Sequence, residues 1–179
     1  GPEKFQAILR HLAAGKRIND AIADNTEPMD KLESAFEKHL KAKAVAFGEK
    51  ADWKKPEAED VNPLDHDSLA EFTKKNPDSL WAIHRQIDAL IEQEKWVDVL
   101  PLAERLIALV PEDYSGDGGY QLKANTLREL KRDDDEIAVL RQIAEHETSA
   151  MPIFLRLIEL DQKKQDWPQV RANAERALA

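Results

Sequence analysis

Residues 95–111 read KWVDVLPLAERLIALVP, and a related stretch, DWPQVRANAERALA, occupies residues 166–179. Trp96 and Trp167 lie 71 residues apart. Each tryptophan is followed by a valine three positions later and by Ala-Glu-Arg from the seventh position. One amphipathic helix that recurs at a distance typical of two repeat units indicates a stack of helical repeats.

Shorter intervals support the same periodicity. Pro77 and Pro111 are 34 residues apart, and we expect each of them to end the second helix of a pair. An aliphatic residue early in each second helix (Val99, Ile137 and Val170) recurs at intervals of 38 and 33 residues. Two unequal repeats therefore account for the 71 residues between the tryptophans.

Apolar residues at helical spacing predict helices throughout the chain, and strand-like alternation is almost absent. In the first 48 residues we expect helices at about 3–14, 17–23 and 29–47, with Gly15 and Gly48 as stop signals. From residue 67 we expect a short helix and then three antiparallel pairs, in the segments 68–75, 79–94, 98–110, 120–131, 134–146, 152–164 and 168–179. Residues 49–66 are acidic, contain two prolines and lack an apolar period, which indicates a linker in which Trp53 packs against a neighbouring helix.

The composition is that of a soluble, helix-rich globular protein, with 42% hydrophobic and 34% charged residues. A net charge of −9 argues against general nucleic-acid binding, because phosphate contacts need clustered lysine and arginine. The absence of cysteine excludes disulfides and thiolate zinc sites. No apolar run is long enough to span a bilayer.

Both ends of the chain suggest a fragment of a longer protein. Gly1-Pro2 resembles the remnant of a removed tag, and the last six residues, AERALA, stop inside a predicted helix. The absence of a signal sequence therefore leaves the localisation undetermined. The oligomeric state is not determined by the sequence either.

Residues 67–179 resemble the tetratricopeptide repeat family, whose unit is a helix–turn–helix of about 34 residues. The resemblance rests on an aromatic residue near the turn (Trp96, Trp167) and on the terminal prolines described above. It also rests on small packing residues, at Ala103, Ala124, Ala174 and Ala177. The departures are Asp134 at the aromatic position of the middle repeat, aliphatic residues in place of the usual alanine, and Ile87 and Ile158 where the family prefers glycine or alanine.

The resemblance implies that the first helix of each pair lines a concave groove that holds an extended peptide or a partner helix. On this sequence the groove residues are Trp81, His84, Asp88 and Glu92 from the first pair, Gln121, Asn125 and Arg128 from the second, and Leu155, Glu159 and Lys163 from the third. An ordinary solvated face without a ligand is the alternative. A clamp for a terminal carboxylate is not expected, because His84 and Asp88 stand where it needs lysine and asparagine.

The first 45 residues resemble the closing helices of gluzincin-type metallopeptidase domains. The resemblance rests on helix pattern and on apolar and glycine positions, namely Gly15, Ile18, Ile22, Leu32, Phe36 and Leu40. A plain helical cap or another helix pair is the alternative. Zinc hydrolysis needs two histidines one helical turn apart with a glutamate between them, and the chain has no such motif among its five histidines.

Three short motifs have a structural explanation that we prefer to a chemical one. In Asp65–Asp67 (DHD) a histidine lies between two carboxylates, and we interpret Asp67 as a helix cap. Asp113–Gly119 (DYSGDGG) lacks the ligand pattern of a calcium loop and predicts a flexible turn. The acidic residues of Arg132–Glu136 (RDDDE) suit the start of a helix dipole.

We therefore predict an all-α protein: antiparallel helix pairs stacked as a short solenoid, preceded by a small helical segment. Residues 1–48 form that segment, 49–66 an acidic linker and 67–179 the repeats. The predicted function is a non-catalytic module that binds a protein or peptide segment, with no metal or cofactor. The alternatives are an accessory region of a zinc metallopeptidase whose catalytic domain is absent from this chain, and a rigid spacer. An upstream H-E-x-x-H motif in a longer reading frame would favour the peptidase.

Overall fold

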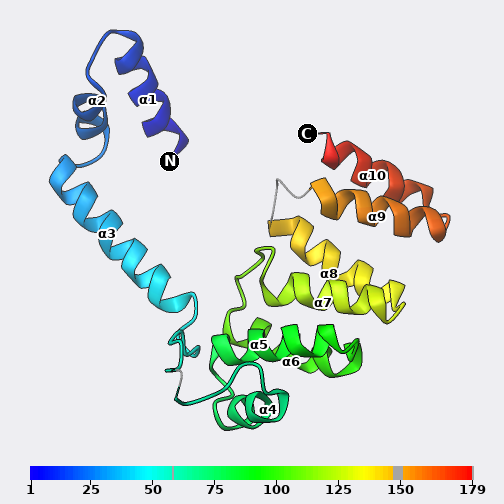
Figure 1. Ribbon diagram of the computed structural model, residues 1–179. Coiled ribbons are helices and arrows are strands. Elements are labelled where there is room, and N and C mark those ends of the chain that lie inside the picture. Colours follow the sequence, from blue (N-terminus) through cyan, green and yellow to red (C-terminus); the bar gives the residue numbers. More distant parts are fainter. Residues whose placement is uncertain (58, 147–150, 179) are drawn as a thin grey trace. The chain divides into compact units, whose positions relative to one another are not determined.

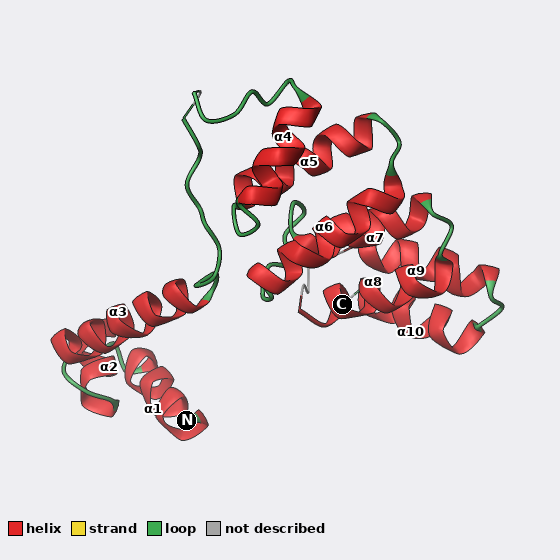
Figure 2. Cartoon of the chain, turned by 90° about the horizontal axis from the view of Figure 1, so that it is seen from below, coloured by secondary structure: helices red, strands yellow, loops and turns green. Residues whose placement is uncertain are grey.

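The computed structural model describes residues 1–57, 59–146 and 151–178, and within them every regular element is a helix. The predicted all-α stack of helix pairs is confirmed (Figures 1 and 2). The chain divides into two compact units, Gly1–Ala46 (unit 1) and Phe47–Ala179 (unit 2). None of the described helices combines the length and the apolar character needed to cross a membrane.

Unit 1 consists of α1 (Pro2–Ala13), α2 (Ile18–Asn25) and α3 (Met29–Ala46). Gly15 ends the first helix, as expected: its φ is +83°, and the Lys16 N–H donates to the carbonyl of His11 at 3.0 Å. Only glycine adopts this conformation without steric cost. Ala21 is the one residue of the three helices that is buried, so unit 1 has a very small core.

Unit 2 contains seven helices in sequence: α4 (His66–Lys75), α5 (Leu80–Glu92), α6 (Trp96–Leu109), α7 (Gly119–Glu129), α8 (Asp133–His146), α9 (Met151–Lys163) and α10 (Trp167–Ala177). Each helix packs against the helices that precede and follow it in the chain. Successive helices therefore form one pile from α4 to α10 (Figure 1). Pro77 and Pro111 follow the ends of α4 and α6, as expected.

The three helix pairs share one turn geometry. Glu94, Lys131 and Gln165, one in each turn, have φ of 56°, 56° and 59°. In each case the next residue donates its N–H to a carbonyl five positions back, at 2.9 Å, in the pairs Lys95–Leu90, Arg132–Leu127 and Asp166–Asp161. The three turns are therefore equivalent, and they set the register of the repeats at intervals of 37 and 34 residues.

This register corrects the sequence alignment of the middle repeat by one residue. Counting from the turn, Glu136 and not Ile137 is the counterpart of Val99 and Val170. The residue at the aromatic position is likewise Asp133 and not Asp134. The alignment slipped because an aliphatic residue was expected at a buried position, whereas Glu136 is 0% exposed.

The core of unit 2 lies between consecutive helices. One cluster joins α5 and α6 around Ile83, Ile87 and Val99, and another joins α7, α8 and α9 around Leu127, Leu140 and Leu157. Burial of such aliphatic side chains provides the main stabilisation of the stack.

A close helix crossing links the first pair to the second at the start of α7. A Cβ added at Gly119 would lie 2.7 Å from the Ile107 nitrogen and 2.8 Å from the Ala103 carbonyl oxygen, so only glycine allows this approach. The crossing sets how the second pair continues the pile.

The segment between α3 and α4, interpreted as a linker, belongs to unit 2 and contacts the rest of it at several points. The Asp52 N–H donates to the Asp78 carbonyl at 2.7 Å, and the Leu80 N–H donates to the Asp52 carbonyl at 3.0 Å. Val61 is 5% exposed and packs with Leu69. The division of the chain into domains at this segment stays a prediction.

Trp53 packs locally rather than against a distant helix. Its ring stacks on Phe47 with a centroid distance of 6.3 Å, and its Nε1 donates to the Gly48 carbonyl at 3.2 Å. Gly48 is required for this contact, because an added Cβ would lie 2.6 Å from the indole. The tryptophan therefore covers the chain where it leaves α3.

Candidate functional site

The ten groove residues predicted from the sequence lie on α5, α7 and α9, the first helices of the three pairs. We call them the first-helix face: Trp81, His84, Asp88, Glu92, Gln121, Asn125, Arg128, Leu155, Glu159 and Lys163. Trp81, His84 and Gln121 are half-buried, and the other seven are exposed. The shared turn geometry makes His84, Gln121 and Leu155 equivalent, and likewise Asp88, Asn125 and Glu159.

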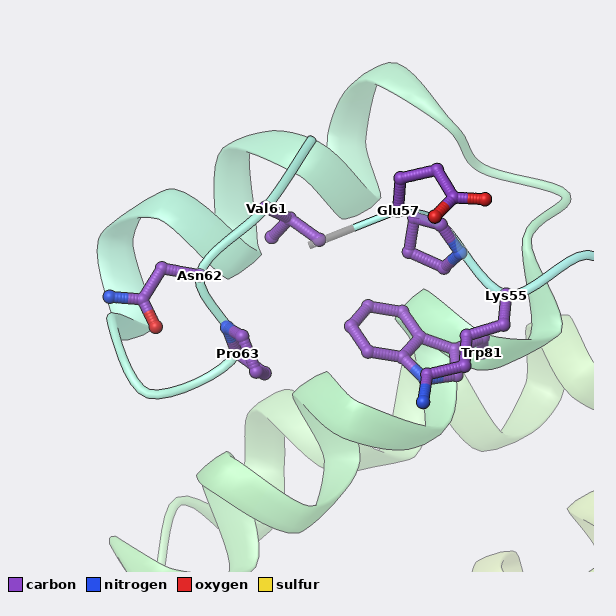
Figure 3. A pocket seen from close by; sticks show the side chains of 7 residues that line it. Lys55, Glu57, Val61, Asn62, Pro63 and Trp81 are labelled. Carbon is purple, nitrogen blue, oxygen red and sulfur yellow. The ribbon is translucent and has the colours of Figure 1, made fainter. Parts of the chain in front are cut away.

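A hollow opens beside Trp81, at the α5 end of this face; we call it the Trp81 hollow (Figure 3). It has a volume of about 690 Å³, and its lining residues are Lys55, Pro56, Glu57, Val61, Asn62, Pro63 and Trp81. A neighbouring hollow of about 400 Å³ shares Trp81 with it and reaches along α5 to Asp88 and Glu92. Three of the predicted residues thus border a recess.

The wall opposite α5 is formed by the segment that precedes α4. Figure 3 shows Val61 and Pro63 of this segment near the indole of Trp81. The sequence analysis did not assign these residues to a site, because acidic stretches with prolines are typical of linkers. Val61, an aliphatic residue in this otherwise mostly polar segment, was an available signal that part of the segment is buried.

The α7 part of the first-helix face presents two side-chain amides. Gln121 Nε2 donates to Asn125 Oδ1 at 3.1 Å. The second Nε2 hydrogen of Gln121 and the Asn125 amide nitrogen remain available as donors, and the Gln121 oxygen as an acceptor. Leu155, the α9 counterpart of Gln121, is 57% exposed and offers an apolar contact instead.

Several charged residues of the face take part in ion pairs, some between helices and some within one helix. Arg128 Nε donates to Glu136 Oε1 at 3.1 Å, and Glu136 also accepts from Arg156. Arg156 Nη1 donates to Glu159 at 2.8 Å, which holds the pKa of Glu159 below its usual value. These contacts tie α7, α8 and α9 together, so Arg128 and Glu159 are not free to bind a ligand without loss of internal pairing.

Lys163 is similarly engaged. It pairs with Asp133 at the start of α8, and this contact lowers the pKa of the Asp133 carboxyl. On α5, Asp88 lies 3.7 Å from the Arg85 guanidinium, a looser and fully exposed pair. Most of the charged side chains of the face are therefore already paired, whereas its uncharged side chains are more available for contacts with a ligand.

Asp161 of α9 is a second buried carboxylate, at 1% exposed. Asn173 of α10 donates to it at 2.9 Å, and Arg141 of α8 lies 3.4 Å away. Burial raises the pKa of Asp161, which the Arg141 charge only partly offsets. It occupies the position of Leu90 and Leu127 in the other two first helices.

The sequence analysis missed these buried carboxylates. The acidic residues of the RDDDE motif lie in the first turn of α8, as expected, but the dipole does not explain the burial of Glu136, which its two arginine partners do. A sequence signal was available for Glu136: this carboxylate lies shortly after the turn between α7 and α8, and eight residues after Arg128. The DHD motif is also corrected: Asp65 and not Asp67 caps α4, accepting from the Asp67 and Ser68 N–H groups at 3.1 and 3.2 Å.

The DYSGDGG segment forms the connection between α6 and α7. Asp113 accepts from the Ser115 N–H at 3.1 Å, and Tyr114 stacks between Tyr120 and His146 with centroid distances of 4.6 and 4.2 Å. Across the described residues, no three histidine or carboxylate side chains gather in a way that could hold a metal ion.

Comparisons with known proteins show the fold. No family model matches the chain, and no curated protein matches it. A solved structure described as "MamA RS-1 ArsTM double mutant" matches with a TM-score of 0.54 and 13% sequence identity, covering 99% of this chain and 92% of that one. That structure is a tetratricopeptide-like helical protein. Nothing in these comparisons supports the resemblance of the first 45 residues to a gluzincin domain.

Proposed function

We propose that residues 67–179 form a non-catalytic interaction module that binds an extended protein or peptide segment along the first-helix face. The observation that carries this proposal is the succession of available groups on three consecutive first helices. An aromatic recess at Trp81 is followed by paired amides on α7 and an exposed leucine on α9.

The chemistry of these groups suggests a segment with apolar residues toward both ends and an exposed backbone between them. Trp81 and Leu155 would contact the apolar side chains. The amides of Gln121 and Asn125 match the donors and acceptors of a peptide backbone. His84, Asp88, Arg128 and Glu159 border the path and would orient the segment. Affinity for such a groove is on the order of micromolar.

A peptide array probed with the full chain tests this proposal. Leu155→Ser and Asn125→Ala should each weaken capture of the selected peptides about tenfold, because each removes one contact from the face. Val97→Ser on the second helix α6 is the matched control, since Val97 is also an exposed aliphatic residue, at 71%. Capture that is equal for the Leu155, Asn125 and Val97 variants would contradict the proposal.

Arg128→Glu is a poor probe of binding for this protein. It would place a third carboxylate near Glu136 and Glu159 and remove an interhelical ion pair. Loss of binding in that variant would then report on folding as well as on recognition. His84→Ala avoids this problem, because His84 makes no ion pair that the structure records within 4.0 Å and is only half-buried.

A further inference from the structure

Helix α3 of unit 1 exposes an apolar stripe. Phe36 is 61% exposed and Leu40 is 48% exposed, and the two follow Leu32 at intervals of four residues, which places all three on one side of the helix. Within residues 1–46, α2 is the helix that packs against α3. Helices in proteins gain most of their stability from tertiary packing of an apolar face, so the stripe is suited to a partner.

Charge is segregated along α3. Its first half carries Asp30, Glu33 and Glu37 against a single lysine, whereas its second half carries Lys38, Lys41 and Lys43 and no carboxylate. The helix dipole favours such a distribution only in the first and last turns. Glu33 and Lys38 lie outside those turns, so the dipole does not account for them, whereas Glu37 and Lys41 pair with each other within α3 at 2.6 Å.

We propose that α3 pairs with α3 of a second copy of this chain in antiparallel orientation. The acidic half of each helix then faces the basic half of the other, whereas a parallel pair would oppose like charges. Placing Phe36 opposite Leu40 of the partner subunit brings the two stripes together about a twofold axis, and also sets Glu33 opposite Lys43 of the partner subunit. The partner of the stripe is therefore α3 of a second copy, because the charges of two α3 helices are complementary only when the helices run antiparallel.

Charge reversal in the full-length chain tests the pairing. E33K sets two lysines opposite each other at both ends of the pair and K43E sets two glutamates opposite each other, so each variant alone should be monomeric by sedimentation equilibrium. Mixing the two should restore a complex of twice the monomer mass, because opposite charges again face each other. A mixture that stays monomeric while the unaltered chain is dimeric would overturn the proposed charge pairing.

The apolar contact has its own matched pair of variants. Phe36→Asp should convert the dimer to monomer, whereas Val45→Asp should not. Val45 is equally exposed, at 65%, but lies on the opposite side of α3. Circular dichroism of both variants shows whether α3 stays helical. An unaltered chain that is monomeric at all concentrations, or a dimer that survives Phe36→Asp, would overturn the proposal.

Orientation can be read from single cysteines, because the natural chain has none. In the antiparallel pair, two copies of His39→Cys lie about 3 Å apart along the axis and should cross-link to each other. Two copies of Leu32→Cys lie about 18 Å apart along the axis and should not. Leu32→Cys should instead cross-link to Ala44→Cys in a mixture. Efficient cross-linking of Leu32→Cys to itself would indicate a parallel pair and overturn the proposed arrangement.

Discussion

Glu136 and Arg156 form a two-pronged ion pair between α8 and α9, with Arg156 Nε donating to one carboxylate oxygen at 2.8 Å and Nη2 donating to the other at 2.9 Å. The contact raises the pKa of Arg156 above its ordinary value. Glu136 occupies the position at which the other two second helices carry valine. In the middle repeat, an ion pair with defined geometry therefore stands where the other two repeats have an apolar side chain.

Removal of Glu136 should destabilise the fold, because it leaves a largely buried guanidinium without its main partner. We expect Glu136→Ala to lower the free energy of unfolding by about 3 kcal/mol. The double variant Glu136→Val with Arg156→Leu should recover most of this loss, since an apolar pair of similar volume replaces the buried ion pair. Urea denaturation measures all three proteins.

Glu159→Ala is the control for this cycle, because Glu159 contacts the same arginine but its side chain is 68% exposed. It should change stability by less than about 1 kcal/mol. A double variant that is no more stable than Glu136→Ala alone would show that the cost is the loss of the ion pair itself and not the charge left unpaired.

Asp161 predicts a pH dependence of stability. Its folded-state pKa is raised above the ordinary value of 3.8, so its contribution to stability is present below that pH and is lost as pH rises through the folded-state pKa. Asp161→Asn has no charge to desolvate and lacks this loss. The stability of the variant relative to the natural chain should therefore increase as pH rises from 3 upward, to a plateau above the folded-state pKa.

Urea denaturation at a series of pH values measures this difference directly. Asn173 can still donate to the amide oxygen that replaces the carboxylate, so the variant keeps this hydrogen bond. A relative stability that falls with rising pH would mean that Arg141 outweighs the effect of burial.

Gly119→Ala should destabilise the contact between α6 and α7. The added methyl group would overlap the backbone of α6 at Ala103 and Ile107, and backbone cannot move aside as a flexible side chain can. We expect a loss of about 1–3 kcal/mol in the free energy of unfolding. Gly116→Ala in the preceding loop is the control, because nothing lies within 4 Å of its added Cβ, and a loss of equal size there would contradict the explanation.

Glycine at the three equivalent turns should stabilise the stack. Lys131 has φ of 56°, a conformation that costs a residue with a Cβ energy and glycine none. Lys131→Gly should raise the free energy of unfolding by about 0.5–1 kcal/mol, because it removes about 1–2 kcal/mol of left-handed strain and adds part of that as entropy cost. The thermal midpoint should rise accordingly. The same change at exposed Ala138, inside α8, should cost about 1 kcal/mol. A thermal midpoint lowered by Lys131→Gly would show that the turn is held by side-chain contacts of lysine.

The sequence analysis located the helices to within a few residues, because helical periodicity and stop signals are local. The fold class followed from the recurrence of Trp96 and Trp167. Most first-helix positions were aligned from their own spacing, although Arg128 lies one residue before the counterpart of Glu92 and Lys163. The second helix of the middle repeat was misaligned by one residue. The assumption that buried positions carry aliphatic residues fails at Glu136, because Arg128 and Arg156 from neighbouring helices neutralise this buried carboxylate.

The amino-acid order by itself determined which segments are helical, that they pair across short turns, and which residues of each first helix share a side. These properties depend on contacts between residues a few positions apart. The tertiary structure alone decided which charges are already paired, as at Lys163, and where the chain leaves a recess, as at Trp81. Such outcomes depend on neighbours brought together only when successive helices and the preceding segment pack.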